Sequence, residues 1–280
     1  MTIAERLRQA AASLGDWCDT PRLDAEILLA HALGVSRARL LADLNEPFDC
    51  PAFEPLLVRR LNHEPIAYIL GTWEFFSMKL EVRPPVLVPR PETEHLVECA
   101  LDHIRRNELL APRILDLCTG TGCVAMALAR HGRQAQVTAT DIHPTALEVA
   151  RSNAARYGLK VDVVESSLYD NLAGAEPFDL IVSNPPYVPD GQWEDLSPVI
   201  TKHEDRGALL AGGDGLDLLR PLIARAPEFL RPGGLLAVEM GEEQGAAVSA
   251  LFEAAGFEDI TVLQDLAGHD RIVRGICTSN

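Results

Sequence analysis

A polar tetrapeptide, Asn184-Pro185-Pro186-Tyr187, follows an apolar run at 180–182 that predicts a buried strand. Pro185 fixes its own φ and restricts Asn184 to an extended conformation, and Pro186 restricts Pro185 in the same way. Neither proline has an N–H that would compete for nearby acceptors. The tetrapeptide therefore predicts rigid hydrogen-bond acceptors at the carboxyl end of a strand, with the Tyr187 ring beside them for stacking.

These acceptors suit a planar nitrogen that carries two hydrogens, as in a carboxamide or an aromatic amine. The Asn184 side-chain oxygen and the Pro185 carbonyl can each accept one N–H, so that the nitrogen lone pair faces an electrophile such as a methyl group on a sulfonium. Transfer of this kind depends on positioning more than on acid–base catalysis. The alternative is a turn that simply leaves the sheet, because Asn-Pro and Pro-Pro also mark turns.

A glycine-rich loop at 118–122 lies between a predicted strand and a predicted helix. Gly120 and Gly122 allow a tight turn and a close approach of the backbone to a ligand, which the helix N-terminal amides would face. Asp141 ends the next predicted strand, where a carboxylate can accept hydrogen bonds from ribose hydroxyls. The loop alone fits a dinucleotide, S-adenosylmethionine or a purely structural turn.

Asp116 lies inside the strand, two residues before this loop. A carboxylate there suits a ligand with ammonium and sulfonium charge and suits a pyrophosphate poorly, because two negative groups would face each other. Asp116 therefore favours S-adenosylmethionine. The alternative is that Asp116 only caps the amides of its own loop.

Alternating strands and helices must position these residues. Strands are predicted at 113–117, 136–141, 161–166, 178–184 and 235–241, and helices at 124–132, 144–158, 215–234 (with a closing turn) and about 244–256. Two more strands, 260–265 and 271–276, can form a hairpin at the sheet edge. The alternation predicts an α/β fold with a parallel, doubly wound sheet, in which ligands bind beyond the carboxyl ends of the strands.

The chain before residue 113 has a different character. Apolar residues recur at helical spacing in 22–34 and 53–64, and aromatic and β-branched residues dominate 72–88. Pro91 and Glu92 then mark the start of a helix over 90–104. We expect a helical N-terminal domain at 1–71, a β-hairpin linker at 72–88 and the α/β domain at 89–280.

Composition excludes several functions. The net charge of −16, from 25 basic and 41 acidic residues, argues against direct nucleic-acid binding but permits a basic protein partner. The sequence has neither an apolar run long enough to span a membrane nor a signal-peptide core, so we expect a cytoplasmic protein with no membrane association. The six cysteines form no C-x-x-C pair and no metal-ligand spacing with histidines, so we expect reduced thiols and no metal.

Almost the whole chain closely resembles the PrmC/HemK family, methyltransferases that modify the glutamine side-chain amide of peptide chain release factors. The resemblance is carried by "EPIAYILG" (64–71), "VLVPRPETEHLVE" (86–98), "ILDLCTGTGCVAMALA" (114–129), "FDLIVSNPPYV" (178–188) and "GGDGLDLLRPLI" (212–223). It implies a Rossmann-like class I S-adenosylmethionine domain with a seven-stranded, mostly parallel sheet. It also implies methyl transfer to the glutamine of the release factors' Gly-Gly-Gln motif, which supports translation termination.

The resemblance assigns roles to individual residues. Asp141 would bind the cofactor's ribose, Leu168 would flank its adenine, and Asn184 would face both the methyl group and the substrate. The methionine part would be held by the loop residues Cys118, Thr119, Gly120, Thr121 and Gly122. Pro185, Pro186 and Tyr187 would line the glutamine pocket, with Asn184 and Pro185 catalytic. Phe76 and the P-R-P-E-T-E run would close that pocket, although Trp73, Phe75 and Phe76 also suit interdomain packing.

Three positions depart from the family's pattern. Cys118 stands where the loop usually has glycine; with a positive φ it would cost about 1 kcal/mol, and we expect instead that the position tolerates a small side chain. Leu168 stands where an aromatic residue is common, which predicts weaker stacking on adenine. The segment 203–213 lacks the proline often found after its Glu204. Arg90 and Glu92 are expected to form an ion pair at the helix start, unless they serve the pocket.

Several related functions are weighed against this one. The full P-E-T-E run favours release factors over ribosomal proteins as the glutamine substrate. An amino-methyltransferase that acts on nucleic acid would need a basic groove, which the net charge opposes. A non-catalytic or NAD-binding protein would have no use for Asn184-Pro185-Pro186-Tyr187.

Overall fold

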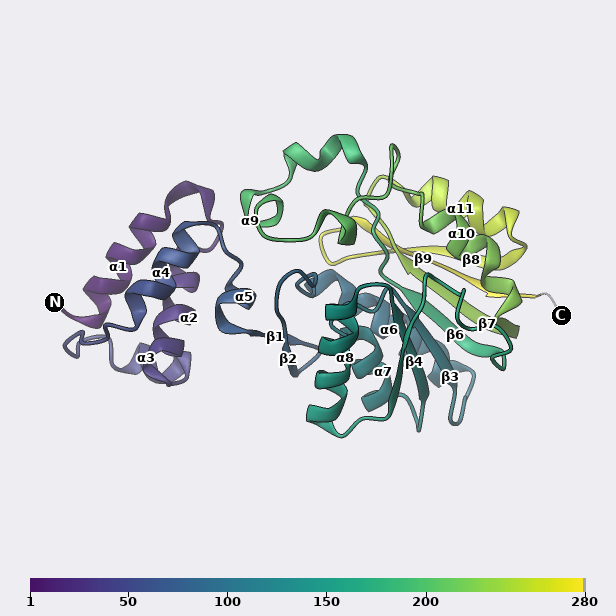
Figure 1. Ribbon diagram of the computed structural model, residues 1–280, viewed down its shortest axis with the longest axis horizontal. Helices are drawn as coiled ribbons and strands as arrows, with labels where there is room; N and C mark the ends of the chain where they lie inside the picture. The colour runs from purple at the N-terminus through teal and green to yellow at the C-terminus, as the bar shows by residue number, and fades with distance from the viewer. Residues whose placement is uncertain (279–280) are drawn as a thin grey trace. The chain divides into compact units, whose positions relative to one another are not determined.

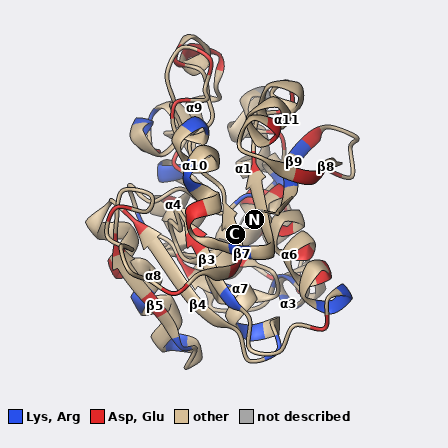
Figure 2. Cartoon of the chain, turned by 90° about the vertical axis from the view of Figure 1, so that its right-hand side faces the viewer, with Lys and Arg blue, Asp and Glu red and all other residues tan. Residues whose placement is uncertain are grey.

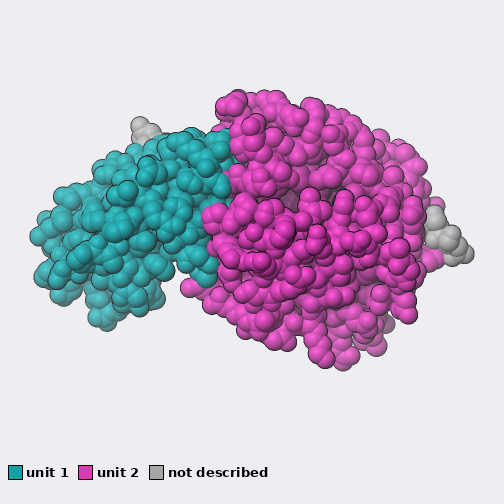
Figure 3. Space-filling model, in the orientation of Figure 1, with its two compact units in different colours: residues 1–72, 197–203 teal, residues 73–196, 204–280 magenta. Residues whose placement is uncertain are grey.

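A computed structural model describes residues 1–278 and is shown in Figure 1. The chain forms two compact units. The first comprises Met1–Thr72 with Ser197–His203, and the second comprises Trp73–Leu196 with Glu204–Asn280 (Figure 3). Among the described residues, no helix is long and apolar enough to cross a membrane.

The first unit is helical. Its helices are α1 (Ile3–Leu14), α2 (Pro21–Leu33), α3 (Arg37–Ala42), α4 (Phe53–Leu61), α5 (Ile66–Leu70) and the short α9 (Pro198–Thr201), with the 3-10 turn η1 (Gly15–Trp17). Thr2 and Glu5 form a capping box at the start of α1, and Gly34 ends α2 in a left-handed conformation. Leu7, Leu28 and Phe53 are fully buried, so the predicted helical spacing does produce a packed core.

The second unit opens with a two-stranded sheet formed by β1 (Thr72–Phe75) and β2 (Met78–Glu81). Asn153 of α8 (Pro144–Tyr157) fastens this hairpin, because its Oδ1 accepts from the Glu81 N–H at 2.7 Å and its Nδ2 donates to the Glu81 carbonyl at 3.1 Å. The same Nδ2 donates to the Thr121 carbonyl at 2.9 Å. One buried amide therefore joins the hairpin to the glycine-rich loop.

The main sheet has seven strands in the order β5-β4-β3-β6-β7-β9-β8. Its strands are β3 (Arg113–Leu117), β4 (Gln136–Asp141), β5 (Val161–Glu165), β6 (Phe178–Ser183), β7 (Leu230–Glu239), β8 (Phe257–Gln264) and β9 (Asp270–Cys277). β3 to β7 pair in parallel, and β9 is antiparallel to both β7 and β8. The predicted mostly parallel sheet and its edge hairpin are thus confirmed.

Helices cover both faces of this sheet (Figure 1). α6 (Glu94–Arg106), α7 (Cys123–His131) and α8 pack on one face, and α10 (Leu219–Arg225) and α11 (Gly245–Ala254) on the other. Neighbouring strand residues divide between the two faces, since Ile114 joins the first core and Leu115 the second. The sheet is therefore buried on both sides, and ligand space is available at its edge.

The helix predicted over 215–234 is present but much shorter than expected, and the closing turn predicted after it falls within a strand. α10 covers only Leu219–Arg225, the 3-10 turn η5 covers Ala226–Glu228, and β7 already begins at Leu230. Phe178 pairs with Leu230 and Leu180 with Leu235, so Arg231 to Gly234 bulge out of the ladder. The strand pairing of Leu230 overrides the local helical pattern.

The remaining short elements are the 3-10 turns η2 (Pro91–Thr93), η3 (Asp190–Asp195) and η4 (Arg206–Ala208). In Figure 2 the basic residues are scattered over several elements, with acidic residues between them. The excess of acidic residues is thus spread over the chain.

Candidate active site

A large cavity lies at the carboxyl ends of β3, β4 and β6, within the second unit. Its volume is about 1200 Å³, including space open to solvent. The residues predicted for cofactor binding that line it are Asp116, Cys118, Thr119, Gly120, Thr121, Asp141, Leu168 and Asn184. The sheet topology therefore brings together side chains from three strand ends, as expected for a doubly wound fold.

The glycine-rich loop is held by its own turn and by α8. Gly120 and Gly122 have φ of +55° and +80°, and a Cβ at Gly122 would lie 3.2 Å from both the Ala150 Cβ and the Met126 Cε. Gly122 does not line the cavity; it lets the loop pack closely on α8. α7 begins at Cys123, so its first amides follow the cavity wall.

Asp116 is buried and has partners in the loop. Its Oδ2 accepts from the Thr119 hydroxyl at 2.5 Å and from the Ala125 amide at 3.1 Å. Burial raises the pKa of Asp116 to about 7 against these two hydrogen bonds. The capping role that the sequence left as an alternative is therefore present, in a residue that also lines the cavity.

Asp141 occupies the end of β4 and spans two backbone amides. Its Oδ2 accepts from the Gly120 N–H at 2.9 Å and its Oδ1 from the His143 N–H at 2.9 Å. The carboxylate thus connects the glycine-rich loop to the start of α8 at the cavity wall.

Asn184 lies where the large cavity meets a smaller one. The second cavity, of about 280 Å³, is lined by Leu87, Arg90, Asn184, Pro185, Pro186, Tyr187, Val188, Ala208 and Leu209. Asn184, Pro186 and Arg90 line both cavities. The Asn184 Nδ2 donates to the Thr93 hydroxyl oxygen at 3.0 Å. The tetrapeptide therefore forms the boundary between two adjoining spaces.

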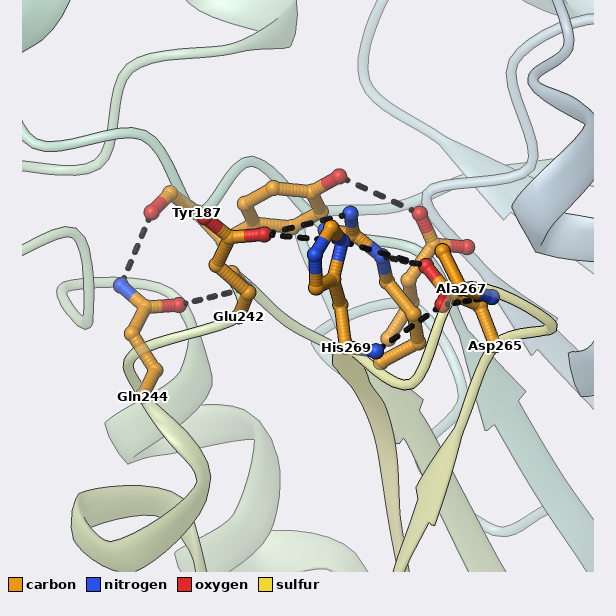
Figure 4. Close-up of polar contacts among 9 residues, drawn as sticks. Tyr187, Glu242, Gln244, Asp265, Ala267 and His269 are labelled. Carbon is orange, nitrogen blue, oxygen red and sulfur yellow. Dashed lines mark hydrogen bonds and ion pairs between the residues drawn. The ribbon is translucent and has the colours of Figure 1, made fainter.

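Tyr187 anchors the other end of the tetrapeptide. Its hydroxyl donates to the Glu239 Oε1 at 3.2 Å, and its carbonyl accepts from the Gln244 Nε2 at 2.9 Å (Figure 4). Burial, followed by the charge of Glu239, raises the pKa of Tyr187, so the phenol remains a donor. A Cβ at Gly215 would lie 2.1 Å from the Tyr187 carbonyl oxygen, which makes glycine necessary there.

The turn between β8 and β9 carries a charged cluster near Tyr187 (Figure 4). Asp265 accepts from the His269 amide at 3.0 Å and from the Arg271 Nε at 2.9 Å, and these bonds lower its pKa to about 2. The His269 ring lies 3.2 Å from the Glu242 carboxylate. This cluster fixes the edge hairpin to the loop that follows β7.

Arg90 pairs with Glu204 rather than with Glu92. The Arg90 guanidinium donates to the Glu204 Oε2 at 2.6 Å, and the Glu204 side chain is fully buried. Arg90 has an extended backbone just before the short turn η2. The expected ion pair at the helix start is therefore corrected: Arg90 pairs instead across the cavity rim.

Two domain families and several known proteins match this chain in sequence. The PrmC N-terminal domain matches residues 5–71, and the methyltransferase small domain matches residues 94–202. The release factor glutamine methyltransferase of Geobacter sulfurreducens is 43% identical over 260 residues, which are 92% of this chain and 90% of that protein. The Vibrio cholerae protein of the same name is 41% identical over 280 residues, 98% of this chain and 96% of its own.

The chain belongs to the release factor glutamine methyltransferase family. Among solved structures, a T. thermophilus 16S rRNA methyltransferase in complex with AdoMet and guanosine matches with a TM-score of 0.56. That match has 19% identity and covers 73% of this chain and 49% of that chain, so it shows the fold only. The resemblance to the PrmC/HemK family is confirmed.

Two residues differ from their expected settings. Cys118 has a φ of +58°, so the position does adopt the left-handed conformation that favours glycine, and the expectation of an unstrained small side chain is corrected. Phe76 lines neither cavity; its ring packs on His131 at 5.4 Å, at the far end of α7 from the glycine-rich loop. We therefore leave Phe76 out of the proposed pocket.

Sequence reasoning placed Thr93 only within the P-R-P-E-T-E run that was expected to close the pocket, and it missed Glu239 and Gln244 as neighbours of the tetrapeptide. Glu239 ends β7 as Asp141 ends β4, so a polar residue at a strand's carboxyl end was an available signal. Gln244 carries no such signal, because its contact with Tyr187 arises from the tertiary fold.

Proposed function

We propose that this chain transfers a methyl group from S-adenosylmethionine to the side-chain amide nitrogen of the glutamine in the Gly-Gly-Gln motif of release factors. Membership in the release factor glutamine methyltransferase family supports the reaction class. The observation that carries the proposal is the position of Asn184 at the junction of two cavities, one large and one small. A cofactor and an amide can then meet at a single side chain.

The large cavity fits S-adenosylmethionine. Its wall has the features that a charged nucleoside needs: a loop that glycine allows to approach closely, a strand-end carboxylate in Asp141 and the exposed apolar Ile142. The buried Thr121 hydroxyl in the same wall has no hydrogen-bond partner among the described residues. We assign the methionine part to 118–122, the ribose to Asp141 and the adenine to the Leu168 segment.

When bound, S-adenosylmethionine would supply a sulfonium methyl group: the glutamine N–CH₃ bond would form as the S–CH₃ bond breaks, S-adenosylhomocysteine would leave, and the nitrogen's proton would pass to water in the open cavity. The chain's own residues orient that nitrogen. The Asn184 Oδ1 and the Pro185 carbonyl would each accept one of its N–H bonds, and the prolines keep these acceptors fixed. Pro186 and Tyr187 would form the wall of the smaller cavity around the glutamine side chain.

Neither the Pro185 carbonyl nor the Asn184 amide has to gain or lose a proton in this reaction. A release factor as substrate would place the reaction in the cytoplasm, where translation ends. We retain the expectation that no nucleic acid is bound directly, because the net charge is −16.

Peptide mass spectrometry tests the proposal. A release factor is incubated with S-adenosylmethionine and the full chain, and in parallel with the Asn184→Ala variant. We expect one added methyl on the peptide that contains Gly-Gly-Gln, located on its glutamine, and none with the variant. Absence of that methyl, in a chain shown by calorimetry to bind the cofactor, would refute the substrate and redirect the search to ribosomal proteins.

A further inference from the structure

Asn184 can serve as an acceptor only if its amide lies one way round. An asparagine side chain presents an oxygen that accepts and a nitrogen that donates, and the two ends are nearly identical in shape. If the amide were reversed, two N–H donors would face the two N–H donors of the substrate amide. The proposed function therefore requires something that fixes the orientation.

Thr93 is the neighbour that contacts the Asn184 nitrogen. The Nδ2 donates to the Thr93 Oγ1 at 3.0 Å, and Thr93 is 2% exposed. A threonine hydroxyl has a single proton but can also accept. Where that proton goes decides whether Thr93 accepts from Asn184 or donates to it.

Glu239 is the buried carboxylate whose pKa the Thr93 hydroxyl affects. Its side chain is 1% exposed, and its Oε2 has no hydrogen-bond partner among the described residues. Burial raises the pKa of Glu239 to about 7, whereas hydrogen bonds from the hydroxyls of Thr93 and Tyr187 lower it. Above that pKa the carboxylate is ionised and only accepts, so a hydroxyl that bonds to it must donate, as the Tyr187 hydroxyl does. The Thr93 oxygen is then left to accept from the Asn184 nitrogen.

We infer that Glu239 and Thr93 are positioning residues that set the orientation of the Asn184 amide, so that its oxygen faces the substrate space. The inference rests on the proposed function, because only an amide substrate needs an acceptor there. Glu239 also holds the Tyr187 hydroxyl at 3.2 Å. Glu239 would therefore act on both ends of the tetrapeptide, on Tyr187 directly and on Asn184 through Thr93.

The decisive variants differ only in the hydroxyl or in the charge. Thr93→Val removes the hydroxyl at nearly constant volume, and Thr93→Ser retains it. Glu239→Gln gives Thr93 a neighbour that can donate, which permits the reversed Asn184 amide. Thr138→Val in β4 removes a hydroxyl away from both cavities and serves as the matched control.

Release-factor methylation at pH 8 separates positioning from binding. We expect Thr93→Val and Glu239→Gln to lower kcat at least about tenfold, while the dissociation constant for S-adenosylmethionine stays within about twofold. Thr93→Ser should recover most of the rate, and Thr138→Val should match the wild type. In the Asn184→Ala background, Thr93→Val should cause almost no further loss, because Thr93 acts through Asn184. Wild-type kcat in Thr93→Val, or losses that simply multiply, would overturn the inference.

A second readout does not depend on activity. In a ¹⁵N spectrum, the Asn184 side-chain amide is the NH₂ pair that disappears in Asn184→Ala. We expect that pair to shift in Thr93→Val and in Glu239→Gln and to remain in place in Thr93→Ser. If the wild type methylates no release factor but the pair behaves in this way, the proposed substrate fails and the orientation device stands. An unmoved pair in Thr93→Val would refute the device itself.

Discussion

At the scale of the residue, Asp141 and Asn184 differ in which of the two cavities they line. Asp141 lines only the large cavity, whereas Asn184 lines both. Asp141 also uses its two oxygens on backbone amides, at 2.9 Å each. The two residues are therefore expected to affect different kinetic constants.

Asn184→Ala should lower kcat by about 100-fold or more, because it removes a preorganised acceptor from the reacting nitrogen. Cofactor binding should stay within a few-fold of the wild type. Asp141→Ala should do the reverse and weaken S-adenosylmethionine binding about tenfold to 100-fold. Calorimetry with the cofactor and single-turnover methylation measure the two effects. Equal losses of both constants in both variants would contradict the division.

Cys118 carries backbone strain that a glycine would relieve. Its φ is +58°, where a Cβ costs about 1 kcal/mol or more. Cys118→Gly should therefore raise the free energy of unfolding by about 1 kcal/mol, and Cys118→Ala, which keeps the Cβ, should not. Urea denaturation compares the three proteins. Equal stabilities for the glycine and alanine variants would show that the left-handed backbone costs nothing here.

The residues proposed for the site were predictable from sequence because they stand at or just after strand ends, as Asp141 and Asn184 do. Their partners were not. Thr93 precedes Asn184 by 91 positions; its run was expected near the pocket, but its hydrogen bond to Asn184 was not. Arg90 was expected to pair with Glu92, yet a more distant carboxylate, Glu204, takes its place. Pattern and spacing describe local structure, whereas these pairs depend on tertiary packing.

At the scale of the element, two loops that pack against the tetrapeptide hold its backbone in place. The Tyr187 carbonyl is approached by Gly215, which has a φ of +74°, and by the Gln244 side chain. Both belong to segments beyond η4, so the turn after β6 is held by elements formed later in the chain.

Gly215→Ala should displace this turn, because its Cβ would lie 2.1 Å from the Tyr187 carbonyl oxygen. We expect a loss of about 2–4 kcal/mol in stability together with a strong loss of methylation. Gly213→Ala is the matched control, since its Cβ would meet no atom within 4 Å. Thermal unfolding and the methylation assay report the two effects. A Gly215→Ala protein that behaves like Gly213→Ala would rule out this constraint.

The bond between Arg90 and Glu204 joins the cavity rim to the segment before η4. Arg90→Met would leave a fully buried carboxylate without its cation, which should cost about 3–5 kcal/mol. Adding Glu204→Gln should restore part of that loss. Arg105→Met removes an exposed pair with Asp102 and should change stability by less than about 1 kcal/mol. Urea denaturation of the wild type, the two single variants and the double variant measures these stability changes. Equal losses of stability in Arg90→Met and Arg105→Met would contradict the importance of the buried pair.

Element prediction succeeded where one periodicity was dominant and failed where two signals competed. The short parallel strands, such as 113–117 and 136–141, have the predicted bounds. The segment 215–234 has helical spacing, but Leu230 pairs with Phe178 and starts β7 early. A local sequence pattern cannot predict strand pairing between residues that are 52 positions apart, such as Phe178 and Leu230.

At the scale of the whole molecule, buried carboxyls make stability depend on pH. Burial raises the pKa values of Asp116 and Glu239 from their ordinary ranges to about 7. The folded protein therefore binds these protons more tightly than the unfolded chain does. Their contribution to stability is complete below about pH 4, declines as the pH rises to about 7 and is constant above that.

Glu239→Gln isolates one of these groups. Around Glu239, Glu92 raises its pKa, and Thr93, Tyr187 and Arg271 lower it. Because glutamine does not titrate, the variant should gain stability relative to the wild type between pH 5 and pH 8, by a few kcal/mol. Urea denaturation at the two pH values gives the difference. A gap that stays constant, or one that grows toward acid, would show that Glu239 has an ordinary pKa.

The first unit also has a consequence for synthesis. Its fold includes residues 197–203, where the His203 ring donates to the Asn62 carbonyl at 3.0 Å. A ribosome that has made the first five helices has thus not yet made every part of that unit. The helical unit is completed only after β3, β4, β5 and β6 have been translated. Much of the second unit is therefore synthesised before the first unit is complete. A gene fragment that stops at residue 72 encodes a unit with one piece missing, and any transplant of these helices onto another enzyme must carry 197–203 with them.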